Sequence, residues 1–398
     1  MFNRALNLFY FSAFLKSQMF LLPVLFLFYQ ENGLSMADYF LFQGIIVLVN
    51  VMLQIPAGFV GDKIPRKYIL LISYTLFLGR IFCWFFWKGM GIVLIGELLY
   101  ALSKALFDTV ESPILYDILS QEQKRNKMVR AYSKLNFALS LGTGIAALCG
   151  AWLYETVGLK VLLGGEFILI TIAILMATQL PFILPEKCQG IYKESLGNMI
   201  KNSISILKEP NNNSCILYSG LLVAFSHFFF WSFQPMMKLA VVPIALFGVV
   251  MFVNNMMRSF GSLLTDTLLK YIRLKVLGRI VFIMNTAGLL CGFVFQKGII
   301  AHWEICLVFV FYLCVCITLQ LMFTIAQISR LQQVSEPHLR TQTAAVNMLI
   351  ARLCTAILLI IPKYLTSLFS LMTLYLVYGL LFVWLGWFLY RRVSRNLA

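Results

Sequence analysis

The chain has 398 residues, of which 61% are hydrophobic and 12% are charged, and its formal net charge is +16. A soluble globular domain has about 45–50% apolar and about 25% charged residues, so this composition excludes an ordinary soluble protein. The basic residues lie in short connections between apolar segments and not along one amphipathic face, which argues against nucleic acid as a partner. The sequence therefore predicts a protein whose surroundings are the lipid bilayer.

Apolar segments of the length needed to cross a bilayer, about 20 residues in a helix, follow one another along most of the chain. The first is too long for the apolar core of a signal peptide and carries Lys16 in its middle, so we expect it to remain as a helix. The predicted membrane helices span residues 5–29, 36–60, 67–88, 91–119, 130–154, 159–184, 213–238, 240–264, 274–296, 302–329, 341–362 and 364–390. This pattern predicts an all-α membrane protein of twelve transmembrane helices, with an N-terminal six-helix bundle at 1–184, a central loop at 185–212 and a C-terminal six-helix bundle at 213–398.

Lysine and arginine residues are distributed unequally between the two sets of predicted connections. One set, with the C-terminal tail, carries Lys63, Arg66, Lys67, Lys124, Arg125, Lys127, Arg130, Lys187, Lys193, Lys201, Lys208, Lys270, Arg273, Lys275, Arg330, Arg340, Arg391, Arg392 and Arg395. The other set holds little beyond Lys88, Lys160, Lys297 and Lys363. Because basic loops stay on the cytoplasmic side, both termini and the central loop are expected in the cytoplasm, and the protein in the plasma membrane, which is the inner membrane of a bacterium.

The connection between the second and third predicted helices reads Gly58-Phe-Val-Gly-Asp62-Lys63-Ile-Pro-Arg66-Lys67. It resembles the signature of the major facilitator superfamily, in which a Gly, three residues, an Asp and a basic residue are followed by a basic pair. The resemblance implies the fold of that superfamily, in which two six-helix bundles alternate access to a central solute site. It also implies a gating motif made of Gly58, Asp62, Lys63, Arg66 and Lys67, with the carboxylate facing the N-terminus of the eleventh helix. The alternative is that the basic residues of this loop only fix the topology.

Two departures from the superfamily pattern weaken the reading of the chain as a drug exporter. Glu97 stands at the start of the fourth predicted helix, where many proton-coupled drug exporters of the superfamily have an arginine. The fifth helix carries Gly142, Gly144 and Gly150 but lacks the Gly-Pro pair of the antiporter motif. These glycines are also the residues that allow helices to pack closely in membranes.

The fourth predicted helix carries a stripe of polar side chains. At 100° per residue, Glu97, Tyr100, Lys104, Asp108 and Glu111 fall within an arc of about 80°. An ionisable group at membrane depth costs several kcal/mol unless it is paired or faces water, so each one is a functional candidate. We therefore expect this face to point away from lipid.

By resemblance, the first, fourth, seventh and tenth helices line the solute path. The candidate solute-binding residues, with one further candidate on the eleventh helix, are Lys16, Gln18, Tyr100, Lys104, His227, Gln234, Gln320, Gln327 and Arg352. Asp108 and Glu111 are the candidate proton carriers, because burial favours a protonated carboxyl group while a nearby lysine favours the ionised form. The alternative is a structural network, with Lys104 pairing to Asp108 at i,i+4 and Lys16 crossing to Glu111.

Other interpretations apply to the candidate His227 and to two further residues, Arg80 and Glu166. His227 stands alone among aromatic residues, where a hydrogen-bonded structural role and a proton relay are both open. Arg80 and Glu166 lie on helices that the superfamily places peripherally, and we expect snorkelling or local pairing there.

Motifs for other chemistries are missing from the sequence. It contains no phosphate-binding loop of the form GxxxxGK[ST], no HExxH and no nucleophile elbow. We therefore expect no enzyme activity, no metal and no cofactor other than protons as the coupling ion. The leading hypothesis is a proton-coupled secondary transporter, acting as a monomer, of a small anionic or zwitterionic organic solute. The alternatives are a proton-antiporting exporter of drugs or amphiphilic metabolites and a transporter-like receptor or assembly protein without flux.

Overall fold

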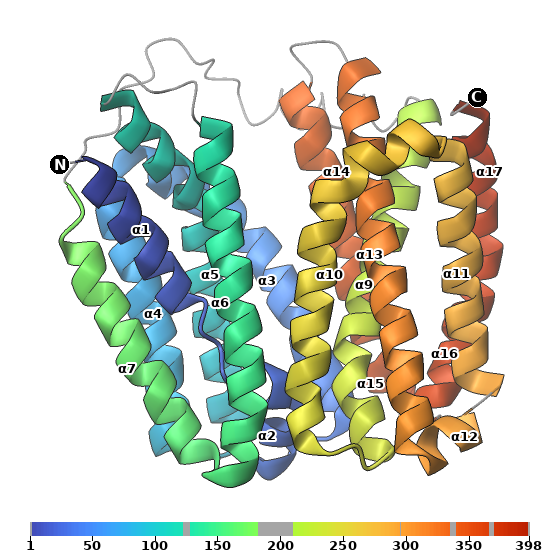
Figure 1. Cartoon of the computed structure of the whole chain (residues 1–398), viewed down its shortest axis with the longest axis horizontal. Coiled ribbons are helices and arrows are strands. Elements are labelled where there is room, and N and C mark those ends of the chain that lie inside the picture. Colours follow the sequence, from blue (N-terminus) through green and yellow to red (C-terminus); the bar gives the residue numbers. More distant parts are fainter. Residues whose placement is uncertain are drawn as a thin grey trace. The chain divides into compact units, whose positions relative to one another are not determined.

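The computed structural model describes residues 2–121, 128–181, 210–294, 296–334, 340–365 and 370–396. Within these ranges it leaves some side chains undescribed, among them those of residues 54–63 and 340–345. All regular elements in the described part of the chain are helices, and the elements along the chain are shown in Figure 1. The predicted all-α fold is confirmed.

The chain divides into two compact units, each of which is described by itself. Unit 1 comprises Met1–Ser35, Ile45–Gly190 and Pro243–Met256, and unit 2 comprises Met36–Gly44, Ile191–Val242 and Met257–Ala398. The predicted central loop lies outside the described residues as far as residue 209, and the next helix begins at Pro210.

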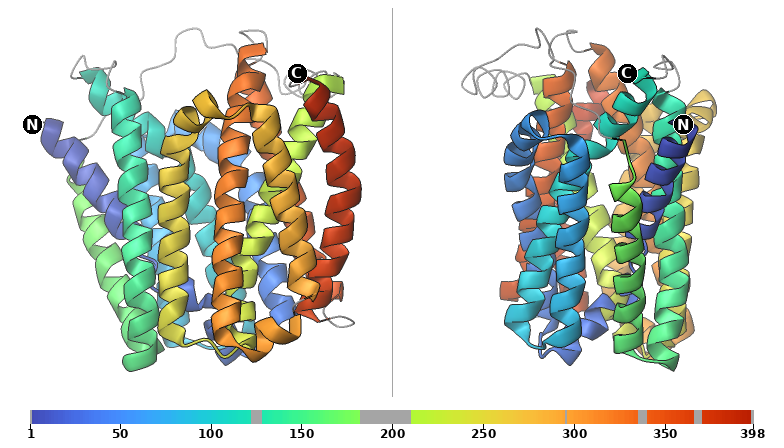
Figure 2. Two further views of the ribbon diagram at one scale, coloured as in Figure 1. Left: turned by 45° about the vertical axis from the view of Figure 1, so that its right-hand side comes forward. Right: turned by 90° about the vertical axis from the view of Figure 1, so that its left-hand side faces the viewer.

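The helices of the first half of the chain are α1 (Phe2–Lys16), η1 (Leu22–Val24), α2 (Leu25–Glu31), α3 (Met36–Lys63), α4 (Arg66–Phe86), α5 (Met90–Gln121), α6 (Met128–Thr156) and α7 (Leu159–Thr178). In unit 1, α4 packs against α5 and α7, and α1 packs against α6 and α7. The right-hand view of Figure 2 shows α4 and α5 side by side and, next to them, the group formed by α1, α6 and α7.

The helices of the second half are α9 (Pro210–Leu239), α10 (Ile244–Tyr271), α11 (Leu274–Val294), α12 (Gln296–Ala301), α13 (Trp303–Val334), α14 (Arg340–Ile360), α15 (Pro362–Leu365), α16 (Leu371–Leu381), the π-helical turn η3 (Phe382–Gly386) and α17 (Trp387–Asn396). In unit 2, α9 packs against α13, α14 and α17. Its buried rings Phe228 and Phe229 contact Tyr375 of α16, which places an aromatic core at the centre of this unit.

Eleven of the described helices are long and apolar enough to cross a membrane. The first predicted helix is absent from this group because the structure interrupts it: α1 ends at Lys16, and η1 and α2 resume only at Leu22. Figure 1 shows this gap as a thin segment between α1 and α2. Together these three elements supply the twelfth membrane segment. The prediction of one continuous helix over residues 5–29 was wrong. Pro23 is the physical reason, because it lacks an N–H and its ring clashes with the carbonyl four residues earlier.

Two helices have their first turns in one unit and the remainder in the other. Residues 36–44 of α3 belong to unit 2, where the Lys363 ammonium lies 2.5 Å from Asp38 Oδ1. A Cβ on Gly44 would lie 2.6 Å from the Ile360 side chain, so the helices approach closely there. The first turns of α10 belong to unit 1, where a Cβ on Gly248 would clash with the carbonyl of Ala147 on α6.

Candidate solute and proton site

The polar stripe predicted on the fourth membrane helix lies on α5, which runs without interruption from Met90 to Gln121. Lys104 and Asp108, one turn apart, form the predicted pair, with Nζ 3.1 Å from both carboxylate oxygens. The side chains are 45% and 22% exposed respectively, so this pair is not enclosed by the described side chains around it.

Glu111 is the next carboxylate along α5, and it has a partner on α6. The Tyr132 hydroxyl donates a hydrogen bond to Glu111 Oε1 at 3.2 Å. Glu111 also interacts electrostatically with Lys16, Lys104 and Asp108. Tyr132 was not among the predicted site residues, because its position opposite α5 depends on how α6 packs.

Lys16 is the last residue of α1, and its side chain is buried. Its ammonium lies 3.8 Å from the centre of the Phe107 ring, a cation–π contact. It interacts electrostatically with Lys104, Asp108 and Glu111 but forms no ion pair with any side chain that the structure describes. The predicted pairing of Lys16 with Glu111 is therefore a longer-range attraction. We refer to Lys16, Lys104, Asp108 and Glu111 as the charged cluster.

The N-terminal part of the stripe on α5 belongs to a second group of side chains. Glu97 is buried, with Arg80 of α4 3.5 Å from its carboxylate and the Tyr29 hydroxyl donating to it at 2.6 Å. The Arg80 guanidinium lies over the Trp84 ring at 4.1 Å and the Tyr100 ring at 4.5 Å. Local pairing of Arg80 is confirmed, since it is buried and bound within unit 1. Tyr100, predicted to contact solute, packs on Arg80 instead of reaching the charged cluster.

Gln18 lies in the segment between α1 and η1. Its side chain is buried, and its Nε2 has no hydrogen-bond partner in the part of the chain that the structure describes. A buried amide of this kind is a group that a polar solute or a water molecule can satisfy.

The predicted gating motif is only partly described. The surroundings of Gly58 and the side chains of Asp62 and Lys63 are not described. Arg66 pairs with Asp117 and donates to the Pro113 carbonyl, both on α5. Lys67 donates to the carbonyl oxygens of Thr178 and Leu180 at the C-terminal end of α7. The helix dipole stabilises a cation at this end. These two residues thus join the ends of α4, α5 and α7 within unit 1.

The predicted solute-binding residues of unit 2 are mostly enclosed in its own core. Gln320 is buried, accepts a hydrogen bond from Ser226 and donates one to Asn285. Gln327 is buried and donates to the Cys215 carbonyl at 2.7 Å. The remaining candidates are Gln234, which is buried; His227, which is exposed and lies 2.9 Å from the Val223 carbonyl; and Arg352, which is half-buried. All of the predicted candidates in unit 2 are neutral except Arg352 and, when protonated, His227.

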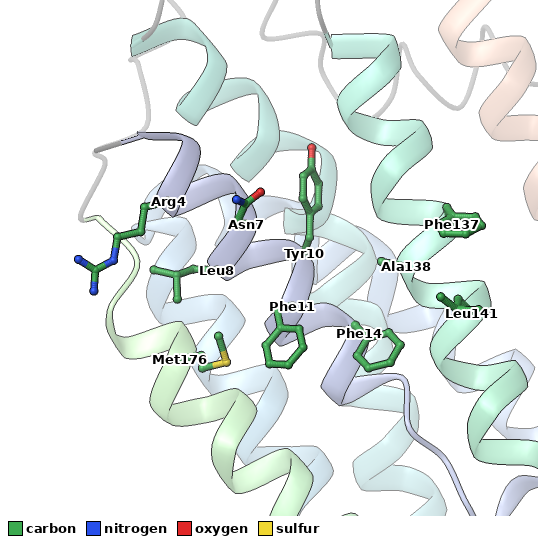
Figure 3. A pocket seen from close by; sticks show the side chains of 10 residues that line it. All are labelled: Arg4, Asn7, Leu8, Tyr10, Phe11, Phe14, Phe137, Ala138, Leu141 and Met176. Atoms are coloured by element: carbon green, nitrogen blue, oxygen red, sulfur yellow. The ribbon is translucent and has the colours of Figure 1, made fainter. Parts of the chain in front are cut away.

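A groove of about 830 Å³ lies along α1, between α6 and α7. Figure 3 shows Arg4, Asn7 and Tyr10 along the first turns of α1 and apolar side chains beyond them. The apolar lining consists of Leu8, Phe11, Phe14, Phe137, Ala138, Leu141 and Met176. None of the residues of the charged cluster lines this groove, so the two features are separate.

Comparison with known proteins agrees with this architecture. The sequence profile of the Major Facilitator Superfamily matches residues 6–359. The chain belongs to this superfamily. It is therefore a multi-pass integral membrane protein of a transporter family, and the predicted recognition is confirmed. A comparison with curated protein sequences gives no match.

Three solved structures resemble the fold at low sequence identity. A variant of the nucleoside transporter NupG has a TM-score of 0.80 at 13% identity, over 98% of this chain and 100% of its own. A POT family transporter in complex with 5-aminolevulinic acid has a TM-score of 0.76 at 10% identity, over 99% and 97% of the two chains. A bacterial homologue of the human lysosomal transporter Spinster, in an inward-facing and unoccupied conformation, has a TM-score of 0.70 at 15% identity, over 99% and 96%. At these identities the likeness shows the fold alone.

Proposed function

We propose that this protein is a proton-coupled symporter that moves a small anionic or zwitterionic organic solute across the plasma membrane by alternating access. The observation that carries the proposal is Lys16, a buried ammonium without an ion pair among the described side chains. A charge at membrane depth is costly unless it is compensated, so a solute carboxylate or phosphate is the partner that the site lacks.

The charged cluster explains why a proton and an anion would bind together. Its two lysines and two carboxylates carry formal charges that cancel. Protonation of Asp108 or Glu111 leaves one positive charge in excess, which attracts an anion, and a bound anion in turn favours the protonated carboxyl group. Reciprocal coupling of this kind is the thermodynamic requirement for symport.

The assay for this proposal uses purified protein in liposomes that contain a pH-sensitive dye. A thermal-shift screen of organic acids, amino acids, dipeptides, nucleosides and 5-aminolevulinic acid first selects the solute, because a ligand that binds only the folded state raises the melting temperature. Adding that solute outside at equal pH should acidify the lumen. Asp108→Asn and Glu111→Gln test which carboxylate carries the proton, with Glu304→Gln, an exposed glutamate on α13, as the control.

The expected result is that at least one of these two variants loses solute-driven acidification while it still exchanges labelled solute for unlabelled solute. Wild-type acidification in both variants and in the double variant would show that the proton role is wrong. Acidification absent from the wild type with every solute in the panel would remove the symport proposal as a whole.

The groove along α1 favours a second candidate function, export of amphiphiles. Its lining is mainly phenylalanine and aliphatic, and Arg4 and Tyr10 supply polar groups along the same helix. A thermal shift confined to lipophilic molecules, with lumen pH changing in the opposite direction during their transport, would favour export. Groove variants Phe14→Ala and Leu141→Ala would then reduce transport more than Lys16→Met.

A further inference from the structure

The interruption of the first membrane segment leaves backbone groups without helical partners at membrane depth. Residues 17–21 lie between α1 and η1. Because these residues are not helical, the N–H of Leu21 does not have the usual helical acceptor, the carbonyl four residues earlier. Each unsatisfied backbone group in the hydrocarbon region costs several kcal/mol, so such a break persists only where other groups satisfy it.

Glu166 of α7 is the side chain that satisfies the break. Its Oε1 accepts a hydrogen bond from the Leu21 N–H at 2.7 Å, and its carboxylate also accepts one from the Phe20 amide. Glu166 is only 4% exposed, and no residue of the charged cluster contacts it by a hydrogen bond or ion pair among the described residues. The side-chain oxygen of Glu166 thus supplies the acceptor that these backbone N–H groups lack within the chain segment itself.

Two glycines of α6 give the non-helical segment its space. A Cβ on Gly150 would clash with the Phe20 carbonyl, and a Cβ on Gly142 would clash with the Ser17 hydroxyl and lie 2.9 Å from the Phe14 carbonyl. The Thr143 hydroxyl, which follows Gly142 on α6, lies 3.4 Å from the Ser17 carbonyl. Helix α6 therefore leaves space for the break and contacts its backbone, so the break is a specifically packed part of unit 1.

Arg80 compensates the charge of Glu166. It interacts electrostatically with Glu166 and forms its ion pair with Glu97. Arg80 of α4 thus offsets the charge of the carboxylate, while the hydrogen bonds of the carboxylate go to the break.

The point at which α1 ends determines where Lys16 lies, because Lys16 is the last residue of α1 and the break begins at the next residue. We infer that Glu166 is a positioning residue for solute binding: by accepting the Leu21 amide it fixes the end of α1 and so holds the Lys16 ammonium in the charged cluster. This inference rests on the proposed role of Lys16. Glu166 itself touches neither the cluster nor the solute.

Hydrogen exchange measured by mass spectrometry in lipid nanodiscs tests the hydrogen bond without any solute. In Glu166→Gln the amide oxygen still accepts from Leu21, whereas Glu166→Asp is one methylene too short and Glu166→Leu has no acceptor. Peptides that cover residues 17–24 should exchange about tenfold faster in the Asp and Leu variants and at the wild-type rate in the Gln variant. Equal exchange in all four proteins would overturn the inference. If the Leu variant does not fold, the comparison of Asp with Gln decides.

Solute affinity then tests whether the position of Lys16 depends on that bond. With the solute selected by the thermal-shift screen, half-saturation should rise about tenfold in Glu166→Asp and stay unchanged in Glu166→Gln, at similar maximal rates. Faster exchange with unchanged half-saturation would overturn the link to Lys16 and leave the symport proposal standing. Failure of wild-type transport would remove the symport proposal, while the exchange data would still report on the break.

Discussion

Unit 1 and unit 2 bury different kinds of polar group. Of the charged residues that the structure describes as buried, one, Asp38, lies in unit 2, and the others lie in unit 1: Lys16, Arg80, Glu97, Asp117 and Glu166. The buried polar groups of unit 2 are mostly neutral, such as Gln320 and Asn285, which form a hydrogen bond with each other. A buried charge responds to a proton or to a charged solute, whereas a neutral amide does not titrate and interacts with a charged solute only through hydrogen bonds. If the proposed symport is correct, this difference assigns the coupling to unit 1 and a stable counterpart role to unit 2.

The largest effect should follow from breaking the ion pair in the core of unit 1. Arg80→Leu leaves Glu97 buried without its cation, and the loss of one member of a buried pair costs about 3–5 kcal/mol. Thermal unfolding in detergent should show a strongly lowered melting temperature. The double variant Arg80→Leu, Glu97→Leu should recover much of the loss, and a double variant as unstable as the single one would contradict this account.

The charge of Lys16 should matter for solute and not for folding. Lys16→Met keeps the apolar stem on Phe107, removes the ammonium, and should weaken solute binding about ten- to hundredfold, as expected for a hydrogen bond to a charged group. The solute-free protein should be as stable as wild type or more stable, because a buried ammonium without a direct ion pair is removed. Titration of the melting temperature with solute measures both, with the exposed Lys88→Met as control. Unchanged affinity would contradict the proposed role.

A smaller effect is expected in the core of unit 2. Gln320→Leu leaves Ser226 and Asn285 without one partner each, which should cost about 1–2 kcal/mol. Because no charge is removed, solute-driven acidification of the liposome lumen should keep its dependence on external pH. A changed pH dependence in this variant would show that coupling extends into unit 2.

The smallest effect should come from the ion pair of Asp38 with Lys363. Asp38 is buried but the Lys363 side chain is 36% exposed, so solvent and salt reach the pair from the lysine side, and we expect the contribution of about 0.2–1 kcal/mol that is usual for solvent-screened pairs. Asp38→Asn should lower the melting temperature slightly at low salt and not at high salt. A large, salt-independent loss would mean that this pair is a principal stabilising contact of unit 2.

How far the sequence predicts this protein depends on the distance between the partners along the chain. Membrane helices follow from local apolar length, so the third predicted helix, 67–88, is close to the observed Arg66–Phe86. The Lys104–Asp108 pair also follows from one turn of helix. The pairing of Glu166 with the Leu21 amide, 145 residues away, depends on how α7 rotates against the break, which no local pattern encodes. The break itself had a local signal, since Pro23 stands inside the predicted helix.

The contact of Asp38 with Lys363 also bears on how the chain is assembled in the membrane. The two residues are 325 positions apart, and ribosomes lengthen a chain by about 5–20 residues per second, so the start of α3 waits roughly 15–65 s for its partner. During that time the close-packing face around Gly44 is uncovered. The contact of that face with Ile360 therefore forms only after this part of α14 has been synthesised, and a chain terminated before it would lack the contact.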